Sequence, residues 1–121
     1  MIRQLDGFSG KAVGFSCHGQ VTRRDYDTVL IPAVEQALAA HDKVRVYYET
    51  APDFTGYDPG AMWADASVGV SHLPHWERVA VVSDVEWLRL AVGGFAFLMP
   101  ALVRLFPGAE AAQARAWIAE G

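Results

Sequence analysis

The sequence has a single cysteine, Cys17, so no internal disulfide framework can stabilise the chain. Positive charge is also scarce: ten Lys and Arg residues stand against fourteen Asp and Glu residues, and the net charge is −4. No basic surplus remains to neutralise phosphates. The composition therefore argues against nucleic acid as a partner.

Long hydrophobic runs are missing as well. The most apolar stretch, 90–103, is too short to span a bilayer. The first residues, MIRQLDGFSG, lack the apolar core of a signal peptide. We therefore expect a cytoplasmic protein whose contact with membranes is confined to the surface as a peripheral association. No repeat, linker or low-complexity segment interrupts the chain, so we expect 1–121 to form one domain.

The stretch Arg78–Pro100 organises the rest of the sequence. It begins with Val79–Val82, an unbroken apolar run rich in β-branched residues. Such a run is typical of a strand buried on both faces of a parallel sheet that helices cover. We predict that other strands flank it on both sides. Ser83 and Glu86 have the spacing of a capping box, which predicts that a helix starts at Ser83.

This helix has almost no polar side chain beyond Arg89, whereas a surface helix normally keeps one polar side. A ligand, a second subunit or a lipid surface must therefore cover it. We expect Leu88 and Val92 to pack on the sheet, and Gly93-Gly94 to loosen the helix after them. The predicted ligand-binding side chains are Trp63, Trp87, Leu90, Ala91, Phe95, Phe97, Leu98 and Met99.

The other elements follow from apolar periodicity. The predicted fold is α/β, in the order ββαβαβαβα, and its first strand lies at an edge. The predicted strands are 2–5, 12–18, 44–49, 79–82 and 102–106, and the predicted helices are about 22–41, 60–72, 83–99 and 109–120.

Local spacing adds detail to these elements. Short side chains on one face of the second strand should let a helix approach closely. Thr22 and Asp25 have capping-box spacing, Asp58 should cap the second long helix, and Pro32 should kink the first one or mark a restart. Along the second long helix, one stripe is formed by Met62, Ala66, Gly69 and Leu73, and it is flanked by Trp63 and Val70.

Candidate catalytic groups are few. Cys17 and His18 are neighbours on a strand, so their side chains point to opposite faces and cannot form a dyad. His72 and His75 could bind a metal, but Pro74 separates them and no cysteine or carboxylate cluster completes a zinc site. No nucleophile elbow is present. We expect no enzyme, no metal and no cofactor, and we expect the tryptophans to be core residues, with one or two of them lining a pocket.

An ordered series of short motifs runs along nearly the whole chain. The motifs are Thr22–Tyr26 with Pro32, Phe54-x-Gly56, Met62-Trp63-x-Asp65, His72–Trp76, Arg78–Asp84 with Trp87, Phe106-Pro107 and Ala114-x-x-Trp117. This series resembles the SpoIIAA-like family. The resemblance implies the fold of the anti-sigma-factor antagonist (STAS) domains, a mixed β-sheet of four to five strands with about four helices.

STAS regulators carry a phosphorylatable serine after the third strand, and the corresponding segment here, Glu49–Gly56, has only Thr50 and Thr55. We therefore expect no functional phosphorylation at Thr55. At the level of fold the family also resembles the lipid-carrying CRAL-TRIO domains.

Two hypotheses follow. The first is a non-enzymatic binding module that holds a nonpolar small molecule or lipid, or touches a membrane surface, through the apolar third helix. The alternative is a STAS-type regulatory domain that binds a protein through its second and third helices. Burial of the apolar helix in a homodimer would also account for its composition.

Overall fold

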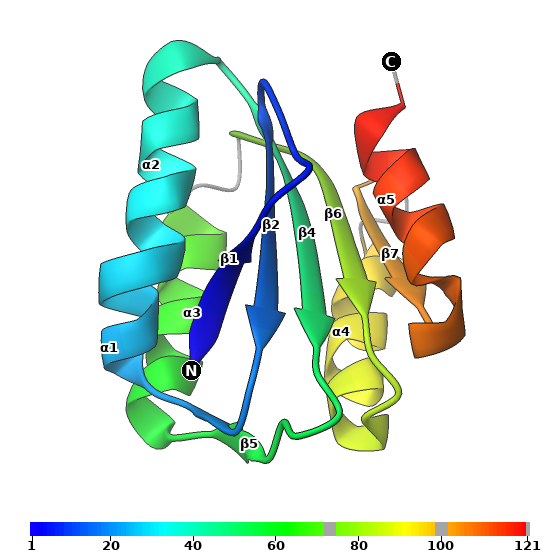
Figure 1. Ribbon diagram of the computed structural model, residues 1–121. Coiled ribbons are helices and arrows are strands. Elements are labelled where there is room, and N and C mark those ends of the chain that lie inside the picture. The colour runs from blue at the N-terminus through cyan, green and yellow to red at the C-terminus, as the bar shows by residue number, and fades with distance from the viewer. Residues whose placement is uncertain (72–74, 99–101, 121) are drawn as a thin grey trace.

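The computed structural model describes residues 1–71, 75–98 and 102–120, and it shows an α/β fold (Figure 1). The strands are β1 (Ile2–Leu5), β2 (Ala12–Cys17), β3 (Gln20–Val21), β4 (Val44–Thr50), β5 (Gly56–Tyr57), β6 (Trp76–Val82) and β7 (Val103–Phe106). The helices are α1 (Arg23–Asp25), α2 (Ile31–Ala40), α3 (Pro59–Ser71), α4 (Glu86–Leu98) and α5 (Ala111–Ala119).

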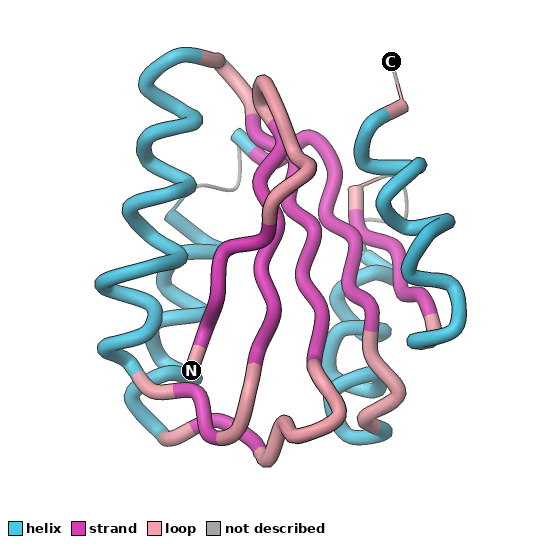
Figure 2. The backbone as a smooth tube through the Cα atoms, viewed as in Figure 1, coloured by secondary structure: helices cyan, strands magenta, loops and turns pink. Residues whose placement is uncertain are grey.

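The main sheet has five strands in the order β1-β2-β4-β6-β7 (Figure 2). Strands β2, β4, β6 and β7 pair in parallel, and β1 pairs with β2 in the antiparallel direction at one edge. The prediction that Val79–Val82 has strands on both sides is confirmed, because β6 lies between β4 and β7. The edge position of the first strand is also confirmed.

Helices cover both faces of this sheet (Figure 1). The residues packed beneath α2 and α3 form one apolar cluster with Phe15, Val46 and Val81. On the opposite face α5 closes a smaller cluster, in which Ala114 and Ile118 contact Tyr47 and Ala80. Successive side chains of a strand therefore belong to different clusters, because they point to opposite faces of the sheet.

The first helical segment starts where its capping box predicts. Thr22 Oγ1 accepts from the backbone N–H of Asp25, and the Asp25 carboxylate accepts from the N–H of Thr22. A π-helical turn, Tyr26–Leu30, then separates α1 from α2, and Pro32 lies in the first turn of α2. Asp25, Leu30 and Ile31 all have right-handed helical dihedrals, so the predicted irregularity takes the form of a π-helical turn directly before Pro32, within a continuous helical segment.

Two local predictions were wrong. The helix α4 begins at Glu86 rather than at Ser83, and Ser83 Oγ accepts from the N–H of Val85 while pairing with Thr50 Oγ1 at 2.8 Å. The face of β2 that carries short side chains is covered at Gly14 by a loop residue and not by a helix, because the Phe8 ring lies directly over Gly14.

The short parallel pair of β3 and β5 was not predicted, since two residues are too few to show a period. At the C-terminal end a 3₁₀ turn, Gly108–Glu110, precedes α5. No helix in the described ranges is long and apolar enough to cross a membrane.

Candidate functional site

An aromatic cluster forms beyond the carboxyl ends of the parallel strands, where open α/β sheets commonly bind ligands. Trp87, in the first turn of α4, packs against Phe54 and Tyr57, with ring centroids 6.3 and 5.9 Å apart. The Phe54 and Tyr57 rings are 5.3 Å apart and meet edge to face. The loop that carries β5 therefore anchors the start of α4 through three rings.

A chain of tyrosine hydroxyls lies behind this cluster. Tyr48 of β4 shares hydrogen bonds with Tyr26, at 3.3 Å, and with Tyr57. Burial, and then the neighbouring Tyr26, raise the pKa of Tyr48 well above its ordinary value of 10. The Tyr48 phenol is therefore neutral at physiological pH and acts as a polar link inside an apolar site, fixing the position of β5.

Large apolar side chains are exposed on α3 and α4. The exposed fractions are 58% for Met62, 68% for Trp63, 48% for Trp87 and 72% for Leu90. These four residues are called the apolar patch below. Both helices pack on the same apolar cluster, through Ala61 and Ala64 of α3 and Val92 of α4, so the four side chains are exposed over one face of the sheet. Because monomeric proteins also expose single apolar residues routinely, this face is a candidate interaction surface.

The predicted binding residues fall into two groups. Trp63, Trp87 and Leu90 belong to the apolar patch, and Ala91 is exposed beside Leu90. The helix α4 extends through Phe95, Phe97 and Leu98, but their side chains, and Met99 altogether, lie outside the described residues. The structure adds Phe54 and Tyr57, which contact Trp87 and were not predicted; the motif around Gly56 was the available signal.

One expectation for the apolar side chains was wrong. Trp63 and Trp87 are not core residues, because the inner face of α3 is filled by Ala61 and Ala64, which are buried, and that of α4 by Leu88. Met62, which belongs to the stripe predicted along α3, is exposed for the same reason. The predicted packing of Leu88 and Val92 on the sheet side of α4 is confirmed.

A hydroxyl, an imidazole and a carboxylate form a hydrogen-bonded series that sequence reasoning missed. Ser16 Oγ lies 2.9 Å from His18 Nε2, and His18 Nδ1 lies 3.2 Å from Asp53 Oδ1. This is the order of groups in serine hydrolases. Ser16 itself is buried next to the carboxyl end of β2, in a strand that pairs with neighbours on both sides. The series instead ties the Asp53 loop to β2, together with the bond from the Gly19 N–H to the Asp53 carbonyl.

The two histidines that were considered as metal ligands, and rejected, are His72 and His75. His75 Nδ1 lies 3.1 Å from the carbonyl oxygen of Asp42, and His72 falls outside the described residues. Within the described ranges no three His, Cys, Asp or Glu side chains are arranged to hold a metal ion. Asp58 caps α3 as predicted, since its Oδ1 accepts from the N–H of Ala61.

A partly buried ionic network lies at the opposite end of the sheet. Glu77 of β6 accepts hydrogen bonds from Lys11 and Arg45, which lower the pKa of the Glu77 carboxyl, Lys11 most strongly. Arg45 is nearly buried and also donates to the carbonyls of Ile118 and Glu120 at the end of α5. One arginine therefore satisfies the last turn of α5 and fixes it to the sheet.

The comparisons with known proteins identify the class. A family model described as SpoIIAA-like matches residues 12–119, and the chain therefore belongs to the SpoIIAA-like family. Among curated proteins none matches the chain.

A solved structure supports this assignment at the level of fold. An uncharacterized protein of the DUF3478 family from Shewanella loihica PV-4, with a SpoIIAA-like fold, superimposes with a TM-score of 0.73 at 22% identity. The match covers 97% of this chain and 93% of that protein. The predicted mixed α/β fold, with five strands and α2, α3, α4 and α5 as its longer helices, is confirmed.

Proposed function

We propose that this chain is a non-enzymatic binding domain that uses the apolar patch of α3 and α4 to contact a lipid surface. The exposure of Met62, Trp63, Trp87 and Leu90 is the observation that carries this proposal. A SpoIIAA-like fold is compatible with a binding or regulatory domain in general. The patch supplies the specific chemistry, because tryptophan rings favour the boundary between lipid headgroups and acyl chains.

The composition of the patch indicates which lipids to test. The net charge of −4 gives no reason for preference for anionic headgroups. The nearest basic residue of α4, Arg89, donates to the Ser83 carbonyl instead of extending into solvent. The binding free energy should therefore come from apolar burial, and it should change little with salt concentration.

Flotation with phosphatidylcholine vesicles tests the proposal. The wild type should float with the vesicles, and Trp63→Ser combined with Leu90→Ser should reduce the vesicle-bound fraction by about tenfold or more, since each side chain contributes about 1.5–3 kcal/mol when buried. Because both residues are exposed, the double variant should keep its circular dichroism spectrum and melting temperature. Adding Gln113→Trp on α5 to the double variant supplies an apolar side chain on the opposite face and should not restore flotation.

The other occupants of the patch are outcomes of the same experiment. A wild-type chain that ignores vesicles but elutes as a dimer, with Trp63→Ser and Leu90→Ser monomeric, would assign the patch to self-association. A nonpolar molecule retained in native mass spectra would assign it to a ligand instead. A monomer without ligand or vesicle binding would leave the STAS-type regulatory alternative, in which a protein covers the two helices.

A further inference from the structure

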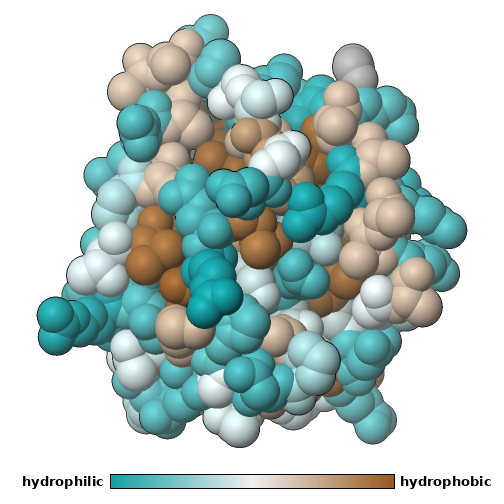
Figure 3. Space-filling model, in the orientation of Figure 1, coloured by the Kyte–Doolittle hydropathy of each residue, from teal (hydrophilic) through white to brown (hydrophobic). Residues whose placement is uncertain are grey.

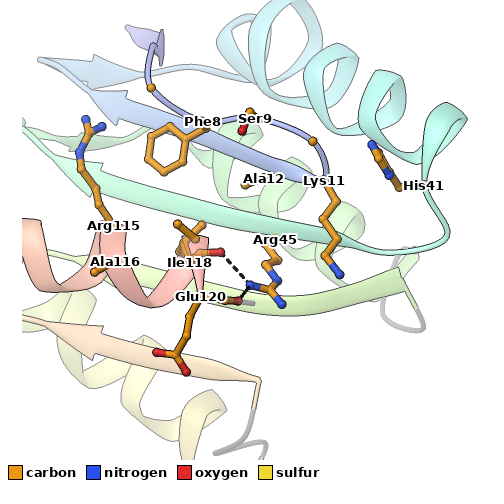
Figure 4. A pocket seen from close by; sticks show the side chains of 13 residues that line it. Phe8, Ser9, Lys11, Ala12, His41, Arg45, Arg115, Ala116, Ile118 and Glu120 are labelled. Atoms are coloured by element: carbon orange, nitrogen blue, oxygen red, sulfur yellow. Dashed lines mark hydrogen bonds between the residues drawn. The ribbon is translucent and has the colours of Figure 1, made fainter.

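A hollow of about 710 Å³ lies between the loop that precedes β2 and the last turns of α5 (Figure 4). This volume is within the range of small-molecule sites in proteins. The hollow is on the α5 side of the sheet, so it is separate from the apolar patch of α3 and α4. The view from β1, with α2 at the left and α5 at the right, shows a surface that mixes hydrophilic and hydrophobic residues (Figure 3).

The walls of the hollow combine apolar and cationic side chains. Phe8, Ala12 and Ile118 contribute apolar surface, and Lys11 and Arg45 lie together at one end (Figure 4). Phe8 is held in place by another residue of the lining, because the Arg115 guanidinium lies over its ring at 4.8 Å and donates to the Asp6 carbonyl. The apolar wall is therefore pre-formed.

The charges at the Lys11 end do not cancel. In the part of the chain that the structure describes, Glu77 is the carboxylate that pairs with both Lys11 and Arg45, so two positive charges face one negative charge there. The Glu120 carboxylate also belongs to a residue of the lining, but it points away from these cations (Figure 4) and lies 3.9 Å from Arg78. Positive charge therefore remains at the Lys11 end, and Arg115 adds one more cation to the lining beside Phe8.

Hydrogen-bond donors remain at the same end. The bonds that Arg45 makes within the described residues use Nε and Nη1, which leaves the N–H groups of Nη2 for another acceptor. Lys11 carries three ammonium hydrogens, and Glu77 is the acceptor that the structure shows for it. Two adjacent cationic donors suit a carboxylate, whose two oxygens can accept from both.

We propose that this hollow binds a small organic monocarboxylate. The carboxylate lies at Lys11 and Arg45, and an aliphatic or aromatic body lies along Phe8, Ala12 and Ile118. This site does not depend on the function proposed for the apolar patch, because the two surfaces lie on opposite faces of the sheet.

Titration of the ¹⁵N-labelled chain with hexanoate, followed by amide chemical shifts, tests the proposal. Saturable shifts should appear in the Gly7–Ala12 loop and in the last turns of α5. 1-Hexanol has the same apolar body without the charge. Its affinity should be lower than that of hexanoate by about tenfold or more, because a hydrogen bond to a charged group contributes at least that factor to affinity. Equal binding of the alcohol, or no saturable shift with hexanoate, would overturn the proposal.

Matched variants locate the ligand. Lys11→Gln should weaken hexanoate about tenfold, while Arg24→Gln, which removes the same charge from the exposed helix α1, should leave affinity unchanged. Ala116→Phe places a ring in the hollow at an exposed position of α5, so it should abolish binding without unfolding the chain; Ala112→Phe, exposed on the same helix but outside the hollow, should not. Unchanged affinity in Ala116→Phe would place any hexanoate site elsewhere and refute the assignment.

Discussion

The Phe8 ring lies so close to Gly14 that a β-carbon at position 14 would stand 2.1 Å from it. The same ring packs on Tyr47, with centroids 5.2 Å apart, and so closes the α5 side of the sheet at β2 and β4. A glycine on β2 is therefore required by close approach and not by backbone conformation, since Gly14 is among the glycines without a positive φ.

This relationship predicts the effect of Gly14→Ala. The new methyl group must displace the Phe8 ring and expose Tyr47, so the substitution should lower the free energy of unfolding by about 1–3 kcal/mol. In a Phe8→Ala background the same change should cost much less, because the obstructing ring is gone. Urea denaturation of the four chains measures the coupling. Additive effects would show that Phe8 does not occupy this position in solution.

Glu77 should make stability depend on pH. Its pKa is lowered in the folded state, so its contribution is complete above the ordinary value of 4.5 and is lost as pH falls through the lowered value. Glu77→Gln should therefore destabilise the chain at neutral pH, by about 1–3 kcal/mol, since it leaves the nearly buried Arg45 without its carboxylate.

Denaturation curves of wild type and Glu77→Gln between pH 3 and pH 7 (on the order of one unit per step) measure this effect. The stability difference between the two chains should shrink as the pH falls toward the acid end of the range. A difference that stays constant over the whole range would show that the carboxylate does not titrate with folding.

Tyr48 should act at alkaline pH. Its pKa is raised in the folded state, so its stabilisation is complete below the ordinary value of 10 and is lost as pH rises from there through the raised value. Tyr48→Phe should lower the free energy of unfolding by about 1–3 kcal/mol at neutral pH, because it removes the hydrogen bonds of Tyr48 to the hydroxyls of Tyr26 and Tyr57.

Above pH of about 10 the stability gap between wild type and Tyr48→Phe should narrow, since only the wild type carries the phenol. Ultraviolet absorbance of tyrosinate, recorded with circular dichroism through the alkaline range, follows ionisation and unfolding together. Ionisation of Tyr48 in the intact fold would contradict the burial that raises its pKa.

Val81→Asp tests the interior position of β6. Val81 is a buried member of the apolar cluster beneath α2 and α3. An aspartate there would be a buried charge without a partner, so the substitution should abolish soluble expression. Val81→Ala, which only leaves space, should remain soluble with a lower melting temperature. Normal expression of the aspartate variant would mean that this strand is not in the core.

Local order in this protein could be predicted from the sequence. The burial of β6, the capping of α1 by Thr22 and of α3 by Asp58, and the edge position of β1 all depend on residues within a few positions of one another. Apolar periodicity and helix capping involve residues within one or two turns of each other, so both can be recognised in the sequence.

The surfaces were decided by tertiary structure alone. Whether Trp63 and Trp87 are buried depends on which side of each helix faces the sheet. On α3 the side that faces the sheet carries small residues such as Ala61, and Trp63 is left exposed. The contact of Phe8 with Gly14 and the sharing of Glu77 by Lys11 and Arg45 require the strand register that brings β2, β4 and β6 together. Register follows from the packing of the whole sheet, which no local pattern in the chain encodes.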